Sequence, residues 1–157
     1  MTRIDFYILS DVGEDAAMRF ACALSLKAIR KGNLVHIHTK DERLARELDE
    51  LMWDYPRHRF IPHTIPSRDG AGVMTNEASQ PVAPVHIDHC PPRHDGHNEG
   101  LLINLGASVP DFFGRFDRVA EIIVGETRQA GRDRYRHYQD RGYPLHHHNL
   151  DDWESVA

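Results

Sequence analysis

Residues 4–38 read IDFYILSDVGEDAAMRFACALSLKAIRKGNLVHIH, and this stretch decides the fold. Its first segment, Ile4–Leu9, is rich in β-branched and aromatic residues, which predicts a buried strand. Apolar residues four positions apart in Glu14–Arg30 are typical of a helix, and Gly32 is a suitable residue to end it. LVHIH at 34–38 then predicts a second strand. A strand, a helix and a second strand in this order favour a parallel α/β sheet.

The same alternation continues toward the end of the chain. Thr39 and Glu42 have the spacing of a capping box, which predicts the start of a second helix that ends near Pro56. The remaining predicted strands are residues 60–62, 85–88, 101–105 and 118–124, and the remaining predicted helices are residues 110–116 and 126–141. We therefore predict a single Rossmann-like α/β domain over residues 1–157, with a mostly parallel sheet flanked by helices.

The length and charge of the chain limit the kinds of protein it can be. With 157 residues, of which 40% are hydrophobic, the chain can build one domain with a proper core but not two. Its net charge of −5 disfavours a protein that coats nucleic acid by bulk electrostatics. Two cysteines are too few for a disulfide framework, and no apolar run reaches the roughly 20 residues of a membrane helix. We expect a soluble cytoplasmic protein.

The turn after the first strand, residues 10–15, bears on whether the domain binds a nucleotide. It has one glycine where a dinucleotide fingerprint needs three, and Asp11, Glu14 and Asp15 place carboxylates where a phosphate would sit. The chain has no GxxxxGK[ST] motif either. We therefore predict a domain that lacks a phosphate-binding loop and binds no nucleotide cofactor.

Histidines are concentrated in polar stretches. A surface loop is predicted at about residues 64–84, a histidine-rich loop at about residues 89–100, and three more histidines follow at 146–148. Zinc sites usually need ligand pairs at fixed spacing or ligands on rigid elements, and the chain has neither HExxH nor CxxC. Cys22 falls inside the first predicted helix, which favours a buried apolar role over that of a nucleophile. We expect no metal, no cofactor and no catalytic residue.

A cluster of aromatic residues and prolines follows the second predicted helix. The segment WDYPRHRFIPH, residues 53–63, places Trp53 and Phe60 close to two prolines. Trp53 can close the helix against the sheet while Phe60 lies in a strand, in which case both rings belong to the core. Alternatively, both rings are exposed anchors of a protein interface, where large aromatic residues are common. The sequence leaves these two interpretations open.

The last predicted helix, ETRQAGRDRYRHYQDR at residues 126–141, concentrates arginines in an otherwise acidic chain. At about 100° per residue, an arc of roughly 100° contains a cationic strip with one aromatic ring: Arg128, Arg132, Tyr135, Arg136 and Gln139. Guanidinium groups bind carboxylates in bidentate fashion, so the strip suits a short acidic peptide with a hydrophobic anchor. A solvated helix face is the alternative. Arg134 projects outside the strip, and we expect its replacement to have little effect on peptide binding.

The order of the motifs along the chain resembles that of one protein family. The shared pattern comprises DFYIL at 5–9, W-x-x-P-x-x-x-F-x-P-H at 53–63, PVHI at 84–87, LLINL at 101–105, DFFGRF at 111–116, RDRYRHY at 132–138 and G-Y-x-L at 142–145. In this pattern the chain resembles, over nearly its whole length, the chi subunits of bacterial DNA polymerase III, accessory proteins of the clamp-loader assembly. The resemblance implies a non-catalytic α/β protein with the topology of a nucleotide-binding domain but without its phosphate loop.

The resemblance also implies two partners in DNA replication. One is the small psi subunit, which links chi to the clamp loader, and the surface that contacts it corresponds to Trp53, Phe60, Pro62 and His63. The other is the acidic, phenylalanine-ended C-terminal tail of single-stranded DNA-binding protein, and the site for it corresponds to Arg128, Arg132, Tyr135 and Arg136, with an apolar floor near Ile123. A monomer or a heterodimer with psi would then associate with DNA only indirectly. A Rossmann-like nucleotide-binding enzyme is the alternative, and a metal-dependent hydrolase is a third possibility.

Overall fold

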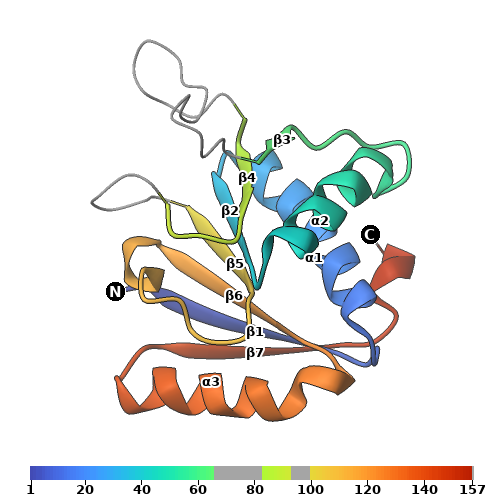
Figure 1. Ribbon diagram of the computed structural model, residues 1–157. Coiled ribbons are helices and arrows are strands. Elements are labelled where there is room, and N and C mark those ends of the chain that lie inside the picture. The colour runs from blue at the N-terminus through green and yellow to red at the C-terminus, as the bar shows by residue number, and fades with distance from the viewer. Residues whose placement is uncertain (66–82, 93–99, 157) are drawn as a thin grey trace.

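The computed structural model describes residues 1–65, 83–92 and 100–156, so most of the two predicted loops lies outside the described residues. The described strands are β1 (Arg3–Leu9), β2 (Val35–Thr39), β3 (His63–Thr64), β4 (Val85–Asp88), β5 (Leu101–Leu105), β6 (Arg118–Ile123) and β7 (Leu145–Leu150) (Figure 1). The helices are α1 (Glu14–Arg30), α2 (Glu42–Asp54) and α3 (Arg128–Asp140), with short 3-10 segments η1 (Phe113–Arg115), η2 (Gly125–Thr127) and η3 (Trp153–Val156). None of these helices is long and apolar enough to cross a membrane.

The strands form one sheet in the order β3-β4-β2-β5-β6-β1-β7, and every described pair of neighbours runs parallel. The predicted α/β fold with a parallel sheet is therefore confirmed. The chain moves from β1 through α1 toward one edge of the sheet, whereas it moves from β6 through α3 toward the other edge. Right-handed crossovers in opposite directions place their helices on opposite faces of a sheet. Accordingly, α1 and α2 lie on one face and α3 lies on the other (Figure 1).

Each face of the sheet has its own hydrophobic core. The core on the side of α1 and α2 includes Phe20, Ile37 and Leu48, whereas the core on the side of α3 and η1 includes Phe6 and Tyr138. Successive side chains of a strand point to opposite faces, so buried strands can supply both cores at once. The sheet therefore separates the surface of α2 from the surface of α3 by two layers of packed side chains.

The start of α2 differs from its prediction. Asp41 caps the helix, because its Oδ1 accepts a hydrogen bond from the backbone N–H of Leu44 at 2.8 Å. The hydroxyl of Thr39 instead donates to the backbone carbonyl of Asp41 at 2.9 Å. The capping box of Thr39 and Glu42 is therefore wrong, although the predicted helix itself is confirmed.

The irregular and edge segments were predicted least well. The predicted strand at 60–62 is wrong, because strand pairing starts only at His63. The predicted helix at 110–116 contains only the three residues of η1. β7, with the sequence LHHHNL, was missed altogether. It lies at the edge of the sheet beside β1, where its residues are half-buried or exposed, so it lacks the apolar pattern of the inner strands.

Gly131 allows α3 to pack closely on β6. A Cβ atom at residue 131 would lie 2.5 Å from Ile123 Cδ1 and 3.2 Å from Ile123 Cγ1. Gly131→Ala would gain about 1 kcal/mol of helix propensity but would clash with this side chain. Because Ile123→Val removes the nearest atom, Gly131→Ala should be more favourable in that background than in the wild type. We expect a coupling of about 1 kcal/mol in a double-mutant cycle measured by urea unfolding, and strictly additive effects would contradict the close packing.

Asp5 of β1 is buried in a network of charged side chains. Its carboxylate accepts hydrogen bonds from Arg3, Arg118 and His148 at 2.9–3.3 Å. Burial by itself would raise the pKa of Asp5, but these hydrogen bonds and the charge of Arg118 bring the pKa below its ordinary value. Asp5 therefore stabilises the fold above its unfolded pKa of about 4, and this contribution is lost as the pH falls through the lowered folded pKa.

Asp5→Asn should lower the free energy of unfolding by about 1–3 kcal/mol at neutral pH, because hydrogen bonds to a charged acceptor are lost. The difference from wild type should shrink below about pH 4, where the wild-type carboxylate becomes protonated and also loses its charge. Urea unfolding at several pH values measures this difference, with Asp133→Asn on the exposed face of α3 as the control. A destabilisation that stayed constant through this range would argue that the carboxylate charge is not what stabilises the network.

Candidate functional site

Two large aromatic side chains, one in the last turn of α2 and one beyond it, form an exposed patch. Trp53 is 59% exposed and Phe60 is 62% exposed, and their ring centroids lie 5.8 Å apart. Of the two interpretations left open by the sequence, the structure supports exposure and not burial in the core. We call Trp53, Phe60, Pro62 and His63 the aromatic patch. Exposed aromatic clusters on a folded domain are typical of sites that bind another protein.

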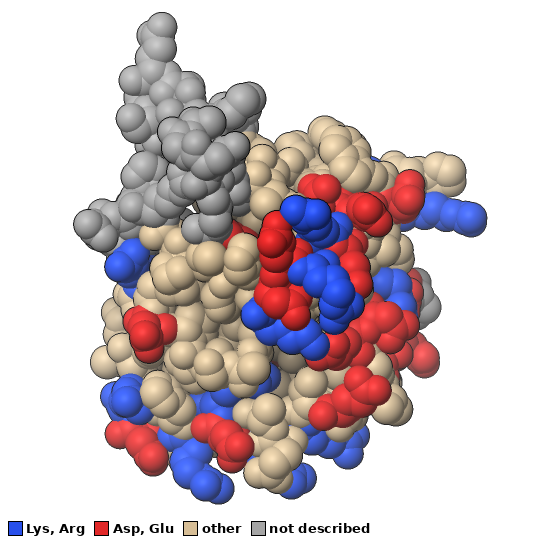
Figure 2. Space-filling model, in the orientation of Figure 1, with Lys and Arg blue, Asp and Glu red and all other residues tan. Residues whose placement is uncertain are grey.

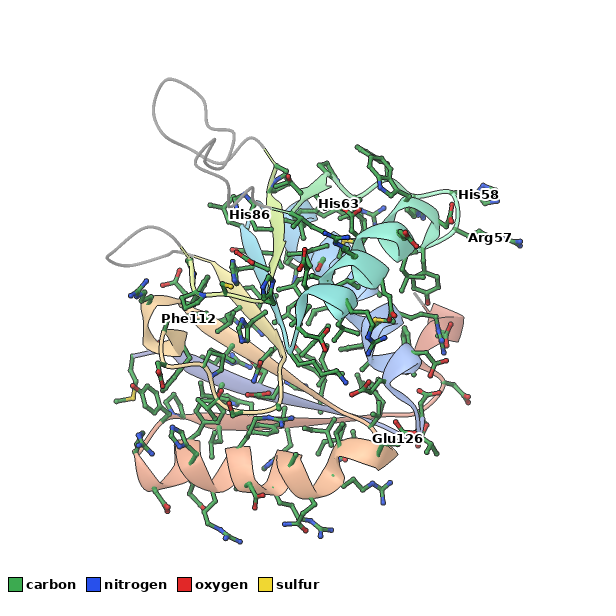
Figure 3. The ribbon with its side chains drawn as sticks, in the orientation of Figure 1. Arg57, His58, His63, His86, Phe112 and Glu126 are labelled. Atoms are coloured by element: carbon green, nitrogen blue, oxygen red, sulfur yellow. The ribbon has the colours of Figure 1, made fainter. Side chains whose placement is uncertain are left out.

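His63 supports the aromatic patch from beneath. Its side chain is fully buried, and its ring lies edge-on to Trp53 with centroids 4.8 Å apart. Its Nδ1 lies 2.6 Å from the Ile61 carbonyl, and its Nε2 lies 3.1 Å from the Asp49 carboxylate. Figure 3 shows His63 directed back toward the body of the protein, whereas His58 projects outward. His63 thus holds Trp53 in position and offers no side-chain surface of its own to a partner.

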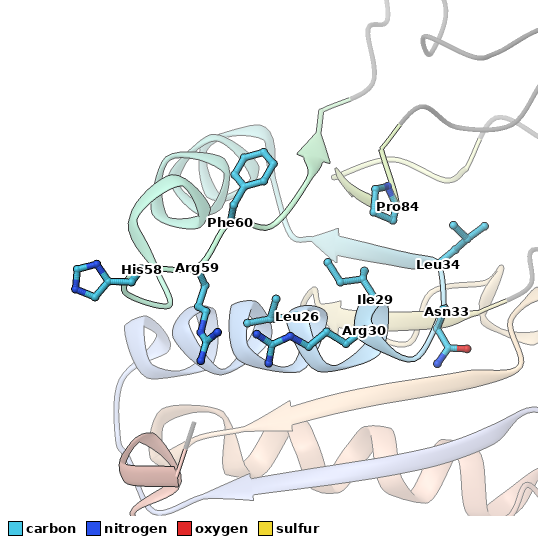
Figure 4. A pocket seen from close by; sticks show the side chains of 10 residues that line it. Leu26, Ile29, Arg30, Asn33, Leu34, His58, Arg59, Phe60 and Pro84 are labelled. Carbon is cyan, nitrogen blue, oxygen red and sulfur yellow. The ribbon is translucent and has the colours of Figure 1, made fainter.

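A groove adjoins the aromatic patch and extends it over α1. It has a volume of about 560 Å³. Its apolar wall comprises Leu26, Ile29, Leu34, Phe60 and Pro84 (Figure 4). Arg30 and Arg59 also line it, so the groove combines apolar surface with positive charge. Sequence analysis did not identify this groove, because its walls come from α1, from the turn after α2 and from the residue before β4.

The cationic strip lies on the outer face of α3. Arg128, Arg132 and Arg136 are exposed, and none of the three forms an ion pair with any described residue. In Figure 2, basic side chains project from the lower edge of the molecule, where α3 lies in Figure 1, with acidic side chains among them. Three guanidinium groups without a carboxylate partner in the described chain are free to bind an acidic ligand.

Tyr135 forms the aromatic floor at one side of the strip. Its half-buried ring lies edge-on to Phe6 with centroids 5.3 Å apart and stacks on His147 at 5.0 Å. Phe6 and His147 are neighbours in register on β1 and β7. Sequence analysis missed His147 in this role, because β7 was not predicted. Ile123, proposed as the apolar floor, is only 5% exposed and lies beneath Gly131, so the accessible apolar surface here belongs mainly to Tyr135.

Arg134 is not an exposed neighbour of the strip. It is 5% exposed, and its Nε lies 2.9 Å from a carboxylate oxygen of Glu121, which is fully buried in β6. The same carboxylate accepts hydrogen bonds from Asn104 at 2.9 Å and from the hydroxyl of Tyr138 at 2.8 Å. Arg134 therefore anchors α3 to the sheet, and replacing it would disturb the helix that carries the strip. This argues against the expectation that its replacement has little effect on peptide binding.

A cavity lies at the carboxyl ends of β5 and β6, where domains of this topology usually bind nucleotides. It has a volume of about 230 Å³, which is small for a nucleotide. Glu14 and Glu126 contribute carboxylates to its lining, and Glu14 forms an ion pair with Lys40 at 3.2 Å. Lys40 and Arg134 also line the cavity, so its acidic and basic side chains balance and it offers a phosphate no excess of positive charge.

Cys22 has the environment expected from the sequence. It is completely buried in α1, and burial raises the pKa of its thiol to about 12. A thiol that remains protonated and inaccessible does not act as a nucleophile.

Comparison with known proteins agrees with the motif order. Residues 1–146 match the model of the family described as "DNA polymerase III chi subunit, HolC". The DNA polymerase III subunit chi of Pseudomonas aeruginosa is 39% identical over 152 residues, which cover 96% of this chain and 98% of that protein. The subunit chi of Escherichia coli is 29% identical over 92% of this chain and 96% of its own length, and that of Haemophilus influenzae is 28% identical over 92% and 95%. This chain therefore belongs to the DNA polymerase III chi subunit family.

Proposed function

We propose that this replication accessory subunit joins two proteins, the psi subunit of DNA polymerase III at the aromatic patch and the C-terminal tail of single-stranded DNA-binding protein at the cationic strip. One observation carries this proposal: two exposed surfaces of different chemistry lie on helices that cover opposite faces of the sheet. Two partners bound at these surfaces would not compete for the same residues. The proposed role needs no catalytic residue and no cofactor.

The cationic strip suits an acidic tail that ends in phenylalanine. Arg128, Arg132 and Arg136 can bind several carboxylates of such a peptide, including its terminal one. The side chains of Tyr135 and His147, which stack on each other, offer a ring surface beside these charges. Exposed charge pairs contribute only about 0–1 kcal/mol each, so we expect modest affinity that falls as salt rises.

The aromatic patch suits a hydrophobic segment of psi. Trp53 and Phe60 supply the exposed anchors, and the adjoining groove provides further apolar surface along α1. Arg30 and Arg59 in the groove favour a segment that carries acidic residues beside its apolar ones. We infer that the protein works in the cytoplasm as a monomer or as a heterodimer with psi, and that its association with DNA is indirect.

The tail site is tested with a fluorescent peptide that carries the acidic sequence and the terminal phenylalanine, without DNA. Arg132→Ala should weaken binding by about 0.5–1 kcal/mol, and Arg132→Glu should weaken it further because an attraction becomes a repulsion. Fluorescence anisotropy at several salt concentrations measures both effects. Arg57→Glu makes the same change in net charge near the aromatic patch and should leave tail binding unchanged. If Arg132→Glu binds the peptide as well as the wild type, the tail site is not on this face of α3.

A nucleotide-binding enzyme is the second candidate, since the sheet topology and the position of the cavity at its carboxyl edge favour it. The small volume of the cavity and its lack of excess positive charge count against it. A nucleotide that raises the melting temperature of the protein would favour the enzyme, whereas the proposed accessory role predicts no such shift.

A further inference from the structure

Histidines and one aspartate lie together at the carboxyl ends of β2 and β4. These strands are neighbours in the sheet, and their sequences VHIHT and VHID align in register. His38, near the end of β2, is paired with Asp88, the last residue of β4. Paired residues of neighbouring strands point to the same face and lie about 5 Å apart. The fold therefore brings two metal-binding residue types together on rigid elements.

The residues that follow Asp88 add two further donors. Asp88, His89 and Cys90 each offer a ligand atom, and these atoms all lie within 4.8 Å of one another. Asp88 Oδ1 and His89 Nδ1 are 3.7 Å apart. Ligands bound to a shared ion at about 2.0–2.3 Å with tetrahedral angles lie roughly 3.3–3.8 Å apart. The Asp88 and His89 donors already lie at this separation, and the Cys90 sulfur lies within 4.8 Å of both.

The backbone and the surrounding side chains restrict this cluster. The backbone N–H of Cys90 donates to Asp88 Oδ1 at 3.2 Å, which turns the chain back toward the carboxylate. Pro91 and Pro92 follow directly and limit the conformations of the chain beyond Cys90. The Asp88 side chain is 3% exposed and that of His89 is 30% exposed, so the cluster lies near the surface and an ion can reach it from solvent.

His38 is held beside this cluster. Its ring lies edge-on to Phe112 with centroids 5.2 Å apart, and the missing side chain of Gly106 leaves room for it, since a Cβ there would lie 3.0 Å from His38 Cδ2. Its Nδ1 is buried and has no hydrogen-bond partner among the described residues. His38 therefore lies beside the cluster, whose grouped ligand atoms belong to Asp88, His89 and Cys90. Figure 3 shows the side chains of this region, with Phe112 and His86 labelled.

We propose that Asp88, His89 and Cys90 form a three-ligand binding site for a thiophilic divalent cation, Zn²⁺ above all, with water in the fourth position. One thiolate, one imidazole and one carboxylate are ligands that zinc accepts, and zinc sites with three protein ligands keep water in the fourth position. This revises the expectation from the sequence that the chain binds no metal. That expectation placed the histidines around residue 90 on a loop, whereas the cluster begins at Asp88, the last residue of β4. A bound ion would hold the chain beyond β4 against the end of that strand.

Zinc binding has a predictable proton balance. Cys90 binds as a thiolate, so its thiol proton is released to solvent when the metal binds.

The site is tested with the full chain, purified without a histidine tag. We expect one equivalent of Zn²⁺ to remain after dialysis, and a cobalt-substituted sample to show the near-ultraviolet charge-transfer band of a thiolate ligand. Cys90→Ser should abolish that band, and His89→Gln and Asp88→Asn should each weaken Zn²⁺ binding, measured by competition with a chromophoric chelator. Each variant should lose more Zn²⁺ affinity than the roughly 10- to 100-fold that is lost when a side chain that only supports a metal ligand is removed.

Matched variants separate this site from adventitious capture by other histidines and thiols. His147→Gln on β7 and Cys22→Ala in α1 should leave stoichiometry, affinity and the charge-transfer band unchanged. Circular dichroism and thermal unfolding without metal should show that every variant is folded. Less than stoichiometric zinc in the wild type, a thiolate band that survives Cys90→Ser, or an affinity unchanged by His89→Gln would each overturn the proposed three-ligand site.

Discussion

Replacing Arg134 with methionine should lower the free energy of unfolding by about 3–5 kcal/mol, because it leaves the buried carboxylate of Glu121 without its positive partner. Glu121 is fully buried, and burial raises the pKa of its carboxyl group. The nearby charge of Arg134 and the hydrogen bonds from Asn104 and Tyr138 partly offset this increase. Burial also raises the pKa of Tyr138, whose hydroxyl therefore stays protonated and donates to Glu121. For a domain stabilised by about 5–15 kcal/mol, the predicted loss is a large share of the total.

A double-mutant cycle separates the charge effect from simple loss of packing. Glu121→Gln alone should also destabilise the protein, because it leaves the charge of Arg134 buried. The double variant Arg134→Met, Glu121→Gln removes both charges and should cost much less than the sum of the single variants. Arg136→Met, exposed on the same helix, should change stability by less than about 0.5 kcal/mol. Urea unfolding measures all four. Equal losses for Arg134→Met and Arg136→Met would contradict a buried ion pair.

Trp53→Ala should weaken binding of psi by about 2 kcal/mol or more, which corresponds to roughly 30-fold in Kd, while the fold stays intact. The binding loss follows from the proposed role of Trp53 as an anchor. The intact fold follows from its position: the side chain is 59% exposed, and its ring neighbours are the exposed ring of Phe60 and the buried ring of His63. Calorimetric titration of the purified variant with psi, together with thermal unfolding of the variant alone, measures both effects.

Further variants show whether the patch acts as a unit. Phe60→Ala should weaken psi binding as well, and the double variant should lose less than the sum of the two, because the rings contact each other. Arg43→Ala, exposed on the same helix, should bind psi normally. Trp53→Ala should also bind the acidic tail peptide normally, because the cationic strip lies on the other side of the sheet. If Trp53→Ala binds psi with wild-type affinity, the psi interface lies elsewhere on the protein.

Local patterns in the sequence were sufficient for the inner elements of the fold. The predicted helix Glu14–Arg30 and the strands Val85–Asp88 and Leu101–Leu105 are confirmed with the same bounds. Each is buried on at least one face, so its apolar residues follow a helical period or form a continuous run. β7 has no such pattern, because an edge strand that is half-buried or exposed can carry three consecutive histidines. Its pairing with β1 depends on contacts that are distant along the chain.

The sequence by itself determined the α/β fold, the absence of phosphate-loop motifs and the two residue clusters that became the candidate surfaces. Only the tertiary structure decided which side chains of those clusters are exposed. Periodicity tells which residues share a face, but not what covers that face. Trp53 is exposed because nothing in the described chain packs over it, whereas Arg134 is buried because β6 places Glu121 beneath α3. In the same way, His38 meets Asp88 only because β2 and β4, which are far apart in the sequence, are neighbours in the sheet.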